Sequence, residues 1–180
     1  MVINKGFIFD RDGVLNHLVK DNSTFRPPWS LEELEINAEN KDLVAYLRER
    51  DFKLFVVSNQ PDVKRGGLTI TNLSYINNEI NEVFNFDEIV VDTTDDVNFK
   101  KPNPYMINKL IEQNSLNRKK TWLIGDRWVD ILAAKNANIN SILLKKEYSF
   151  NATSLGSPPD NLKADVTVKK INEIISLDFL

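Results

Sequence analysis

The sequence predicts an α/β fold in which helices cover both faces of a mainly parallel sheet. Short apolar runs rich in β-branched and aromatic residues recur along the chain, and such runs are typical of strands buried on both faces. Segments with helical periodicity separate these runs. Because alternation of strands and helices favours parallel strands joined by crossover helices, the expected architecture is a doubly wound, Rossmann-like three-layer sandwich.

Five apolar runs are predicted to form the main strands, and a weaker sixth strand follows late in the chain. The five runs cover residues 7–9, 53–57, 88–91, 121–124 and 141–144, and the sixth strand covers residues 164–168. Amphipathic helices are predicted over residues 40–50, 73–84 and 104–113, with a closing helix over residues 171–180. Their apolar faces include Leu43, Val44, Leu47, Ile76, Ile80, Val83, Phe84, Met106, Ile107, Leu110 and Ile111.

Two stretches do not fit this alternation, residues 17–35 and residues 151–163. Ligands of open α/β sheets bind beyond the carboxyl ends of the strands, so the first stretch is predicted to overhang a site. The second is interpreted as a surface connection. Trp29, in the first stretch, either packs loops together or lines the substrate entrance. For His17 a structural or surface role is favoured, and for Trp128 core packing.

Composition limits the kinds of function. The 180 residues fit one domain over residues 1–180, since a chain of this length buries enough surface to fold without disulfides or a structural metal. The absence of Cys excludes thiol chemistry, and one His leaves no zinc ligand set. A net charge of −3 disfavours nucleic acid as a partner. Neither a signal segment nor an apolar span is apparent, so we expect no membrane partner and a cytoplasmic location.

Asp10 and Asp12 carry the strongest local signal, because two acids and then Gly13 follow directly after an apolar strand. Carboxylates placed there are costly unless a cation or a proton transfer uses them. An ordinary Asx-rich turn is the alternative for this segment alone.

Three further strand ends and helix entrances carry polar groups. Ser58 and Asn59 follow the second main strand, although such residues also cap helices. Lys100 and Lys101 precede a helix, where cations are usually solvated. The acids of the segment 125–130 follow the fourth strand, although Asp130 also suits the first turn of a helix. Four separate structural explanations are less economical than one phosphoryl-transfer site at a common sheet edge.

These motifs resemble those of the haloacid dehalogenase superfamily. The four motifs of that family match Asp10-Arg11-Asp12-Gly13, Ser58, Lys101 and the segment Gly125-Asp126-Arg127-Trp128-Val129-Asp130, in order and spacing. The segments 59–66 and 101–104 are similar to the branch that contains heptose bisphosphate and histidinol-phosphate phosphatases, subfamily IIIA. The resemblance implies the family's α/β core, and the short connections leave no room for a large cap domain.

The resemblance also implies a mechanism. Asp10 would attack phosphorus to form an aspartyl phosphate, and Asp12 would act as general acid and base. Mg²⁺ would bind the carboxylates of Asp10 and Asp126 and the backbone carbonyl of Asp12, with Asp130 either coordinating directly or acting through another ligand.

The remaining implied roles concern the substrate. Ser58, Asn59 and Lys101 would bind the phosphate, while Arg65 and Lys100 are the candidates for substrate specificity. The zinc loop common in the resembled branch is replaced by residues 92–99, which contain neither Cys nor His, and Tyr105 stands where that branch commonly has Gly. The chemistry therefore transfers better than the substrate.

The expected function is a magnesium-dependent phosphomonoesterase acting on a small phosphorylated metabolite, a sugar phosphate or bisphosphate. The alternatives are a histidinol-phosphate or other small-metabolite phosphatase and, in a different class, a catalytically weak domain that binds phosphorylated ligands. A nucleic-acid 3′-phosphatase is disfavoured by the acidic net charge. A monomer or a small homo-oligomer is expected.

Overall fold

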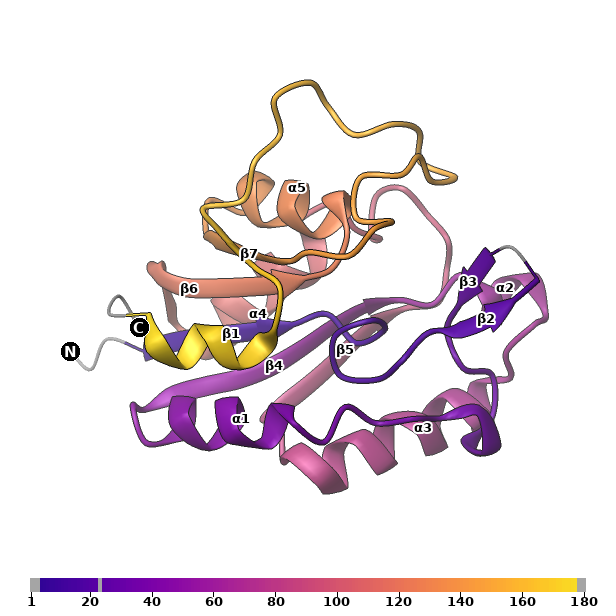
Figure 1. The fold of residues 1–180 in the computed structure, drawn as a ribbon, viewed down its shortest axis with the longest axis horizontal. Coiled ribbons are helices and arrows are strands. Elements are labelled where there is room, and N and C mark those ends of the chain that lie inside the picture. Colours follow the sequence, from indigo (N-terminus) through magenta and orange to yellow (C-terminus); the bar gives the residue numbers. More distant parts are fainter. Residues whose placement is uncertain (1–3, 23, 178–180) are drawn as a thin grey trace.

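A six-stranded sheet forms the middle layer of the computed structural model, which describes residues 4–22 and 24–177 (Figure 1). The strands lie in the order β5-β4-β1-β6-β7-β8, and every neighbouring pair is parallel. This confirms the predicted doubly wound α/β fold. The strands are β1 (Asn4–Phe9), β4 (Phe52–Asn59), β5 (Glu88–Asp92), β6 (Leu116–Gly125), β7 (Asn140–Leu144) and β8 (Val166–Val168).

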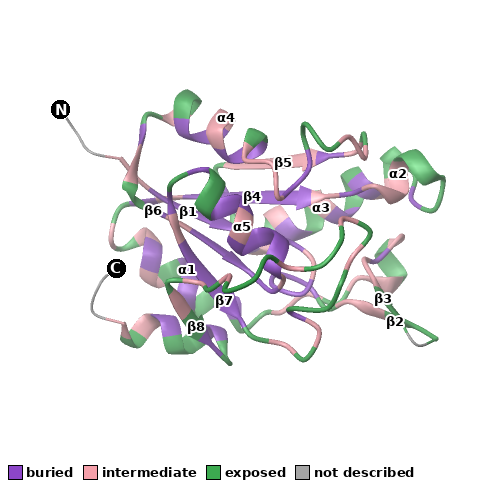
Figure 2. Ribbon diagram, turned by 90° about the horizontal axis from the view of Figure 1, so that it is seen from above, coloured by how far each residue is buried: buried purple, intermediate pink, exposed green. Residues whose placement is uncertain are grey.

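Helices cover both faces of the sheet, and their inward sides are the buried ones (Figures 1 and 2). One face packs against α1 (Asn40–Arg48), α3 (Ile70–Phe84) and the 3-10 helix η2 (Ile171–Ser176). The other face packs against α4 (Tyr105–Asn114) and α5 (Trp128–Asn136). Side chains alternate across a strand, so Phe7 and Phe9 of β1 enter the first core and Ile8 enters the second.

The helix boundaries differ from the predicted ones for local reasons. α3 begins at Ile70, earlier than predicted, because the Thr69 hydroxyl accepts the Asn72 backbone N–H at 3.1 Å and caps the helix. The closing helix was predicted as residues 171–180. Within the described residues it is the 3-10 helix η2, which buries Ile171 and Ile174, and residues 178–180 lie outside the described part. Side chains three residues apart eclipse in a 3-10 helix, which suits this pair.

The stretch 17–35 is more ordered than the sequence indicates. It contains an antiparallel hairpin of β2 (Val19–Asp21) and β3 (Thr24–Arg26), followed by the 3-10 helix η1 (Leu31–Glu33). The sequence also did not predict the one-turn helix α2 (Asp62–Arg65) after β4. In both ribbon views the hairpin and α2 lie beyond the carboxyl ends of the central strands (Figures 1 and 2). The predicted overhang is therefore confirmed, and its form is a short hairpin.

None of the helices in the described part of the chain is long and apolar enough to cross a membrane.

Leu54 of β4 offers a test of the first core, because its side chain is fully buried there. We expect Leu54→Ala to lower the free energy of unfolding by about 2–5 kcal/mol, since it removes buried methyl groups and leaves a cavity. Leu31→Ala is the control, because Leu31 is 41% exposed, and a change within about 0.5 kcal/mol is expected for it. Urea unfolding measures both, and equal losses would contradict the packing of this core.

Candidate active site

The carboxyl ends of three adjacent central strands bring the predicted residues together. Strand β1 lies between β4 and β6, and its Phe9 is aligned with Val56 and with Ile124. The Asp10 backbone N–H continues this pairing by donating to the Ile124 carbonyl at 2.8 Å. Residues just beyond these positions must therefore meet at one edge of the sheet.

Three of the predicted acids form a buried cluster. Carboxylate oxygens of Asp10, Asp126 and Asp130 all lie within 4.8 Å of one another. The three residues are 7%, 0% and 1% exposed. Carboxylates this close in a low-dielectric environment repel strongly, so the cluster requires cations.

Lys101 supplies the cation that the protein itself contributes. Its Nζ lies 2.6 Å from Asp10 Oδ1 and 2.7 Å from Asp130 Oδ1, and it also donates to the Val57 carbonyl at 3.1 Å. Burial opposes the charge of Lys101, but the two carboxylates outweigh it and raise its pKa. Burial, together with the neighbouring carboxylates, raises the pKa of Asp10 well above its ordinary value. One ammonium thus faces three carboxylates.

The cluster fits a divalent cation. Three carboxylates against one ammonium leave a formal excess of two negative charges. Asp126 Oδ1 is buried and has no hydrogen-bond partner within the described residues. Hard cations such as Mg²⁺ prefer carboxylate oxygens. Three of the acids predicted to hold Mg²⁺ therefore lie close enough together to share one divalent cation.

The other oxygen of Asp126 is held by a residue that the sequence did not indicate. Tyr148 lies in the loop after β7, and its hydroxyl donates a hydrogen bond of 2.7 Å to Asp126 Oδ2. Burial, followed by the nearby Asp130, raises the pKa of Asp126 to about 7. Tyr148 also packs its ring against Phe25 of the hairpin, with centroids 5.5 Å apart. One tyrosine thus connects the acid cluster to the hairpin.

Asp12 lies apart from Lys101, in its own polar network. The fully buried Arg11 guanidinium contacts Asp12 Oδ1 at 3.1 Å, and Asn16 Nδ2 donates to the same oxygen at 3.0 Å. Gln60 Nε2 donates to Asp12 Oδ2 at 2.6 Å and to Ser58 Oγ at 2.7 Å. These contacts fix the orientation of the Asp12 carboxylate, which lines the cavity beside Asp10.

Two glycines make this close packing feasible. Gly13 has a φ of +90°, and a Cβ added there would collide with the Asp126 carboxylate. A Cβ at Gly125 would collide with the Asp130 side chain. Both motif glycines therefore admit the acids to the cluster.

The three phosphate-binding candidates share one cavity but differ in their hydrogen-bond partners. Ser58, Asn59 and Lys101 all line the same cavity. The Asn59 amide, however, is used on the Lys101 backbone: Nδ2 donates to the carbonyl at 2.9 Å, and Oδ1 accepts the N–H at 2.8 Å. Asn59 accordingly positions Lys101, in addition to any role with a ligand.

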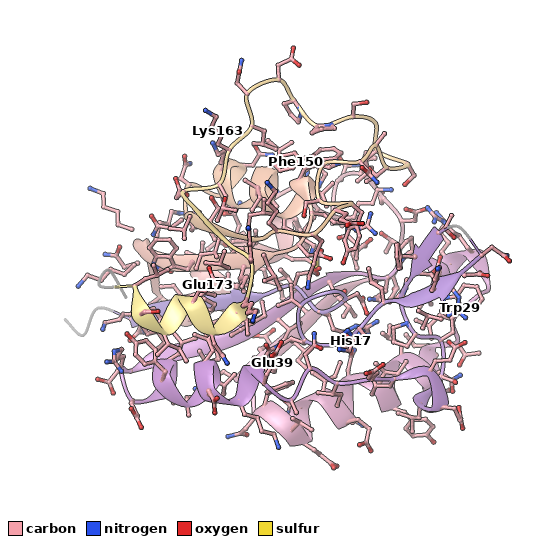
Figure 3. All side chains as sticks on the ribbon, viewed as in Figure 1. His17, Trp29, Glu39, Phe150, Lys163 and Glu173 are labelled. Atoms are coloured by element: carbon pink, nitrogen blue, oxygen red, sulfur yellow. The ribbon has the colours of Figure 1, made fainter. Side chains whose placement is uncertain are left out.

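A cavity of about 500 Å³ opens above the acids. Pocket volumes of this size are typical of small-molecule sites. The hairpin and α2 form one wall, to which Trp29 contributes by donating from Nε1 to Asp62 Oδ2 at 3.0 Å. Figure 3 shows Trp29 at this hairpin end of the molecule. Thr153 and Ser154 lie on the lining too, so the stretch interpreted as a surface connection also reaches the site.

The two specificity candidates are both bound to one acid. Arg65 lines the cavity, but its Nη2 lies 2.8 Å from Asp95 Oδ2. Lys100 is buried, is absent from the cavity lining and contacts Asp95 Oδ1 at 2.6 Å. The hydrogen bond from Lys100, supported by Arg65, lowers the pKa of Asp95. Lys100 therefore lies outside the cavity lining. Arg65 lies on the lining, but its positive charge is paired with Asp95.

His17 and Trp128 take the positions favoured from the sequence. The His17 side chain is 57% exposed, lies 3.9 Å from Glu35 and does not line this cavity. Trp128 is buried, and its Nε1 donates to the Asn151 carbonyl at 3.1 Å. Within the described residues, no hydrogen bond or ion pair joins either side chain to the acid cluster.

Comparison with known proteins gives one family match and several distant relatives. The family model for haloacid dehalogenase-like hydrolases matches residues 22–144. A D-glycero-beta-D-manno-heptose-1,7-bisphosphate 7-phosphatase of Helicobacter pylori is 25% identical over 153 residues, covering 80% of this chain and 85% of that protein. The histidine biosynthesis bifunctional protein HisB of Baumannia cicadellinicola is 24% identical over 182 residues, covering 97% of this chain and 50% of that protein.

A solved structure shares the fold. It is that of D,D-heptose 1,7-bisphosphate phosphatase from B. bronchiseptica, complexed with magnesium and phosphate. The TM-score is 0.77 at 19% sequence identity, and the superposition covers 95% of this chain and 96% of that one. At this identity the likeness establishes the arrangement of strands and helices.

The raised pKa of Asp126 predicts how the stability of the metal-free protein depends on pH. A carboxyl whose pKa is about 7 when folded and 3.8 in its ordinary state binds a proton more tightly in the folded protein. Its stabilising contribution is complete at acidic pH and is lost as the pH rises toward about 7. We expect the free energy of unfolding, measured in chelator, to fall over this range. Asp126→Asn is expected to reduce the slope, and an unchanged slope would contradict the prediction.

Proposed function

The chain belongs to the haloacid dehalogenase-like hydrolase family, and we propose that it is a magnesium-dependent phosphatase that works through an aspartyl phosphate on Asp10. One observation carries the proposal. Asp10 lies at the base of an open cavity, paired with Lys101 and surrounded by two further carboxylates, while Asp12 is held separately beside it. That arrangement separates a nucleophile from an acid/base group.

The metal would be held by the carboxylates of Asp10, Asp126 and Asp130, together with the backbone carbonyl of Asp12. When bound, Mg²⁺ offsets the repulsion between the negative charges of the acids and of a phosphate. Tyr148 holds Asp126 by one oxygen and leaves Oδ1 for a ligand.

The residues of the chain perform two displacements. An Asp10 oxygen attacks phosphorus, the bond from phosphorus to the leaving oxygen breaks, and Asp12 gives its proton to that oxygen. Asp12 then accepts a proton from water, whose oxygen attacks phosphorus and releases Asp10 and inorganic phosphate. The contacts from Arg11, Asn16 and Gln60 keep the Asp12 carboxylate aimed into the cavity for both transfers.

The transferred group needs positive and donor groups around its non-bridging oxygens. Lys101 and the Ser58 hydroxyl both line the cavity and would supply them. Asn59 holds the backbone of Lys101 at two points, so its contribution is to keep the ammonium in place.

For the substrate we propose a sugar phosphate or bisphosphate. The Helicobacter pylori relative is named for a heptose bisphosphate, and the cavity of about 500 Å³ accommodates a phosphorylated sugar. The likeness to the histidine biosynthesis protein keeps a histidinol-phosphate-like or other metabolite substrate as the second candidate. A domain that binds phosphorylated ligands without turnover is the candidate of a different class.

The Asp10→Asn variant tests the mechanism. Because an amide is a poor nucleophile, we expect hydrolysis of an aryl phosphate with Mg²⁺ to fall by about three orders of magnitude or more. Circular dichroism and thermal unfolding provide the control for folding. Near wild-type turnover in a folded Asp10→Asn protein would falsify the nucleophile, and an inert wild type across many phosphate esters would favour the binding domain.

A substrate panel tests the sugar assignment. The residues that bind the phosphoryl group do not discriminate between leaving groups. Differences in kcat/KM between phosphate esters must therefore arise from the cavity walls. We expect a phosphosugar to exceed histidinol phosphate, nucleotides and phosphoamino acids. If histidinol phosphate or a nucleotide leads by about tenfold, the sugar assignment is wrong although the phosphatase chemistry stands.

A further inference from the structure

We propose that a second cavity, on the side of the sheet that carries α1 and η2, binds a small phosphate-bearing anion. This cavity, of about 260 Å³, shares no lining residue with the cavity above the acids. Its volume is below the range of drug-sized ligands, so it suits an inorganic anion or a short phosphate ester. The inference goes beyond the proposed function, because it concerns binding by a different set of residues.

Three lysines line this cavity because two parallel strands end beside each other. Leu144 of β7 is aligned with Val168 of β8 at the last residue of each strand. The residues that follow the two strands therefore emerge at one edge of the sheet. Three of them, Lys146, Lys169 and Lys170, reach the same cavity.

The ammonium groups of these lysines are not paired within the described part of the chain. No carboxylate lies within ion-pair distance of Lys146, Lys169 or Lys170, and their side chains donate no hydrogen bond. Among the described residues, Glu39 is the only acid on the lining, so three ammonium groups and one carboxylate leave a formal excess of two positive charges. Like charges gathered at one cavity repel each other, and a bound anion would relieve that repulsion.

The loop after β1 contributes a wall that hydrogen bonds hold in place. The Val14 carbonyl accepts from Asn37 Nδ2 and from Asn40 Nδ2, both at 2.8 Å, and Asn40 is 1% exposed. His17 and Glu39 line the same cavity, and Figure 3 shows both on the α1 side of the sheet. A wall that is already ordered loses little conformational entropy when a ligand binds.

This wall is continuous with the loop that carries Asp12. The side chain of the fully buried Asn16 donates from Nδ2 to the His17 carbonyl at 2.9 Å and to Asp12 Oδ1 at 3.0 Å. The Gly13 backbone N–H donates to the Asn16 carbonyl at 2.8 Å. An anion held against Val14 and His17 would therefore restrain the segment 13–17, which connects the second cavity to Asp12.

A small anion suits this cavity better than a polyanion does. The chain carries a net charge of −3, which repels a long polyanion. Glu39 on the lining, and Glu35 at 3.9 Å from His17, add negative charge at the same surface. Lysine ammonium groups are compact point charges that suit phosphate oxygens. The ligand is therefore inorganic phosphate or the phosphate group of a small ester.

The only histidine of the chain makes the binding testable. The imidazole resonance of His17 in NMR reports on this cavity, and His17 does not line the cavity above the acids. We expect a saturable shift of this resonance when inorganic phosphate is added in chelator at constant pH and ionic strength. In the Lys169→Gln/Lys170→Gln protein the Kd is expected to rise about tenfold or more, because hydrogen bonds to charged groups are lost.

A titration with a hexose monophosphate distinguishes the two sources of the phosphate group. A shift with both probes means that the phosphate group alone is recognised, whereas a shift with one probe identifies that probe's class as the ligand. Lys119→Gln/Lys120→Gln is the matched control, since these consecutive lysines are exposed and line neither cavity. Its Kd is expected to stay within about twofold of the wild-type value.

Three outcomes would overturn the binding site. They are a shift that does not saturate with either probe, an equal Kd in wild type and the Lys169→Gln/Lys170→Gln protein, and a preference for a polyanion. The last outcome would be a saturable shift with a single-stranded oligonucleotide or phosphatidylserine vesicles at a lower phosphate concentration than with either small probe.

Hydrogen exchange tests the restraint of the segment 13–17. We expect saturating phosphate to slow amide exchange in this segment by about twofold to tenfold in wild type, and to have no such effect in Lys169→Gln/Lys170→Gln. Unchanged exchange in a wild-type protein whose His17 resonance shifts would refute the restraint. Equal slowing in both proteins would assign the effect to phosphate above the acids, and would also refute it.

Discussion

The ammonium of Lys101, held between Asp10 and Asp130, is the interaction on which the site depends. Removing a charge from water is costly, and it is tolerated only when close, well-oriented partners replace the solvent. The chain meets this condition by delivering Asp10 from the end of β1 and Asp130 from the first turn of α5, and by holding the Lys101 backbone with Asn59 at two points. The ammonium cannot neutralise three carboxylates, and the remaining negative charge is what suits the cluster to a divalent cation.

Much of this arrangement could be predicted from the sequence because the ends of the buried strands can be recognised in it. An apolar run predicts a buried strand, and acids placed directly after the run predict a shared edge once the sheet is parallel. Asp10, Ser58 and Asp126 followed from that logic. Tyr148 and Gln60 did not, because their roles depend on the path of a loop and on which way a buried amide turns. Neither has a periodic or positional signal in one sequence.

A sequence does not show which of its charged side chains are paired with each other. Arg65, Lys100 and Arg127 are all cations in the sequence, yet in the structure Asp95 binds the first two and no described carboxylate binds the third. Asp95 stands thirty positions from Arg65 along the chain, so its effect depends on how the loop after β5 folds back. The value of a cation for ligand binding is its charge after internal pairing, and only the folded structure determines that quantity.

The described elements include no cap domain over the cavity, so its walls must supply the discrimination between substrates. The hairpin of β2 and β3 is tied to the loop after β7 through Phe25 and Tyr148. Trp29, in the segment that follows β3, is tied to α2 through Asp62. These contacts set the width of the opening by packing. Discrimination then depends on which fixed group meets the leaving part of the substrate. In such a site, a substitution in the wall alters substrate preference while the acids at the base continue to support the same chemistry.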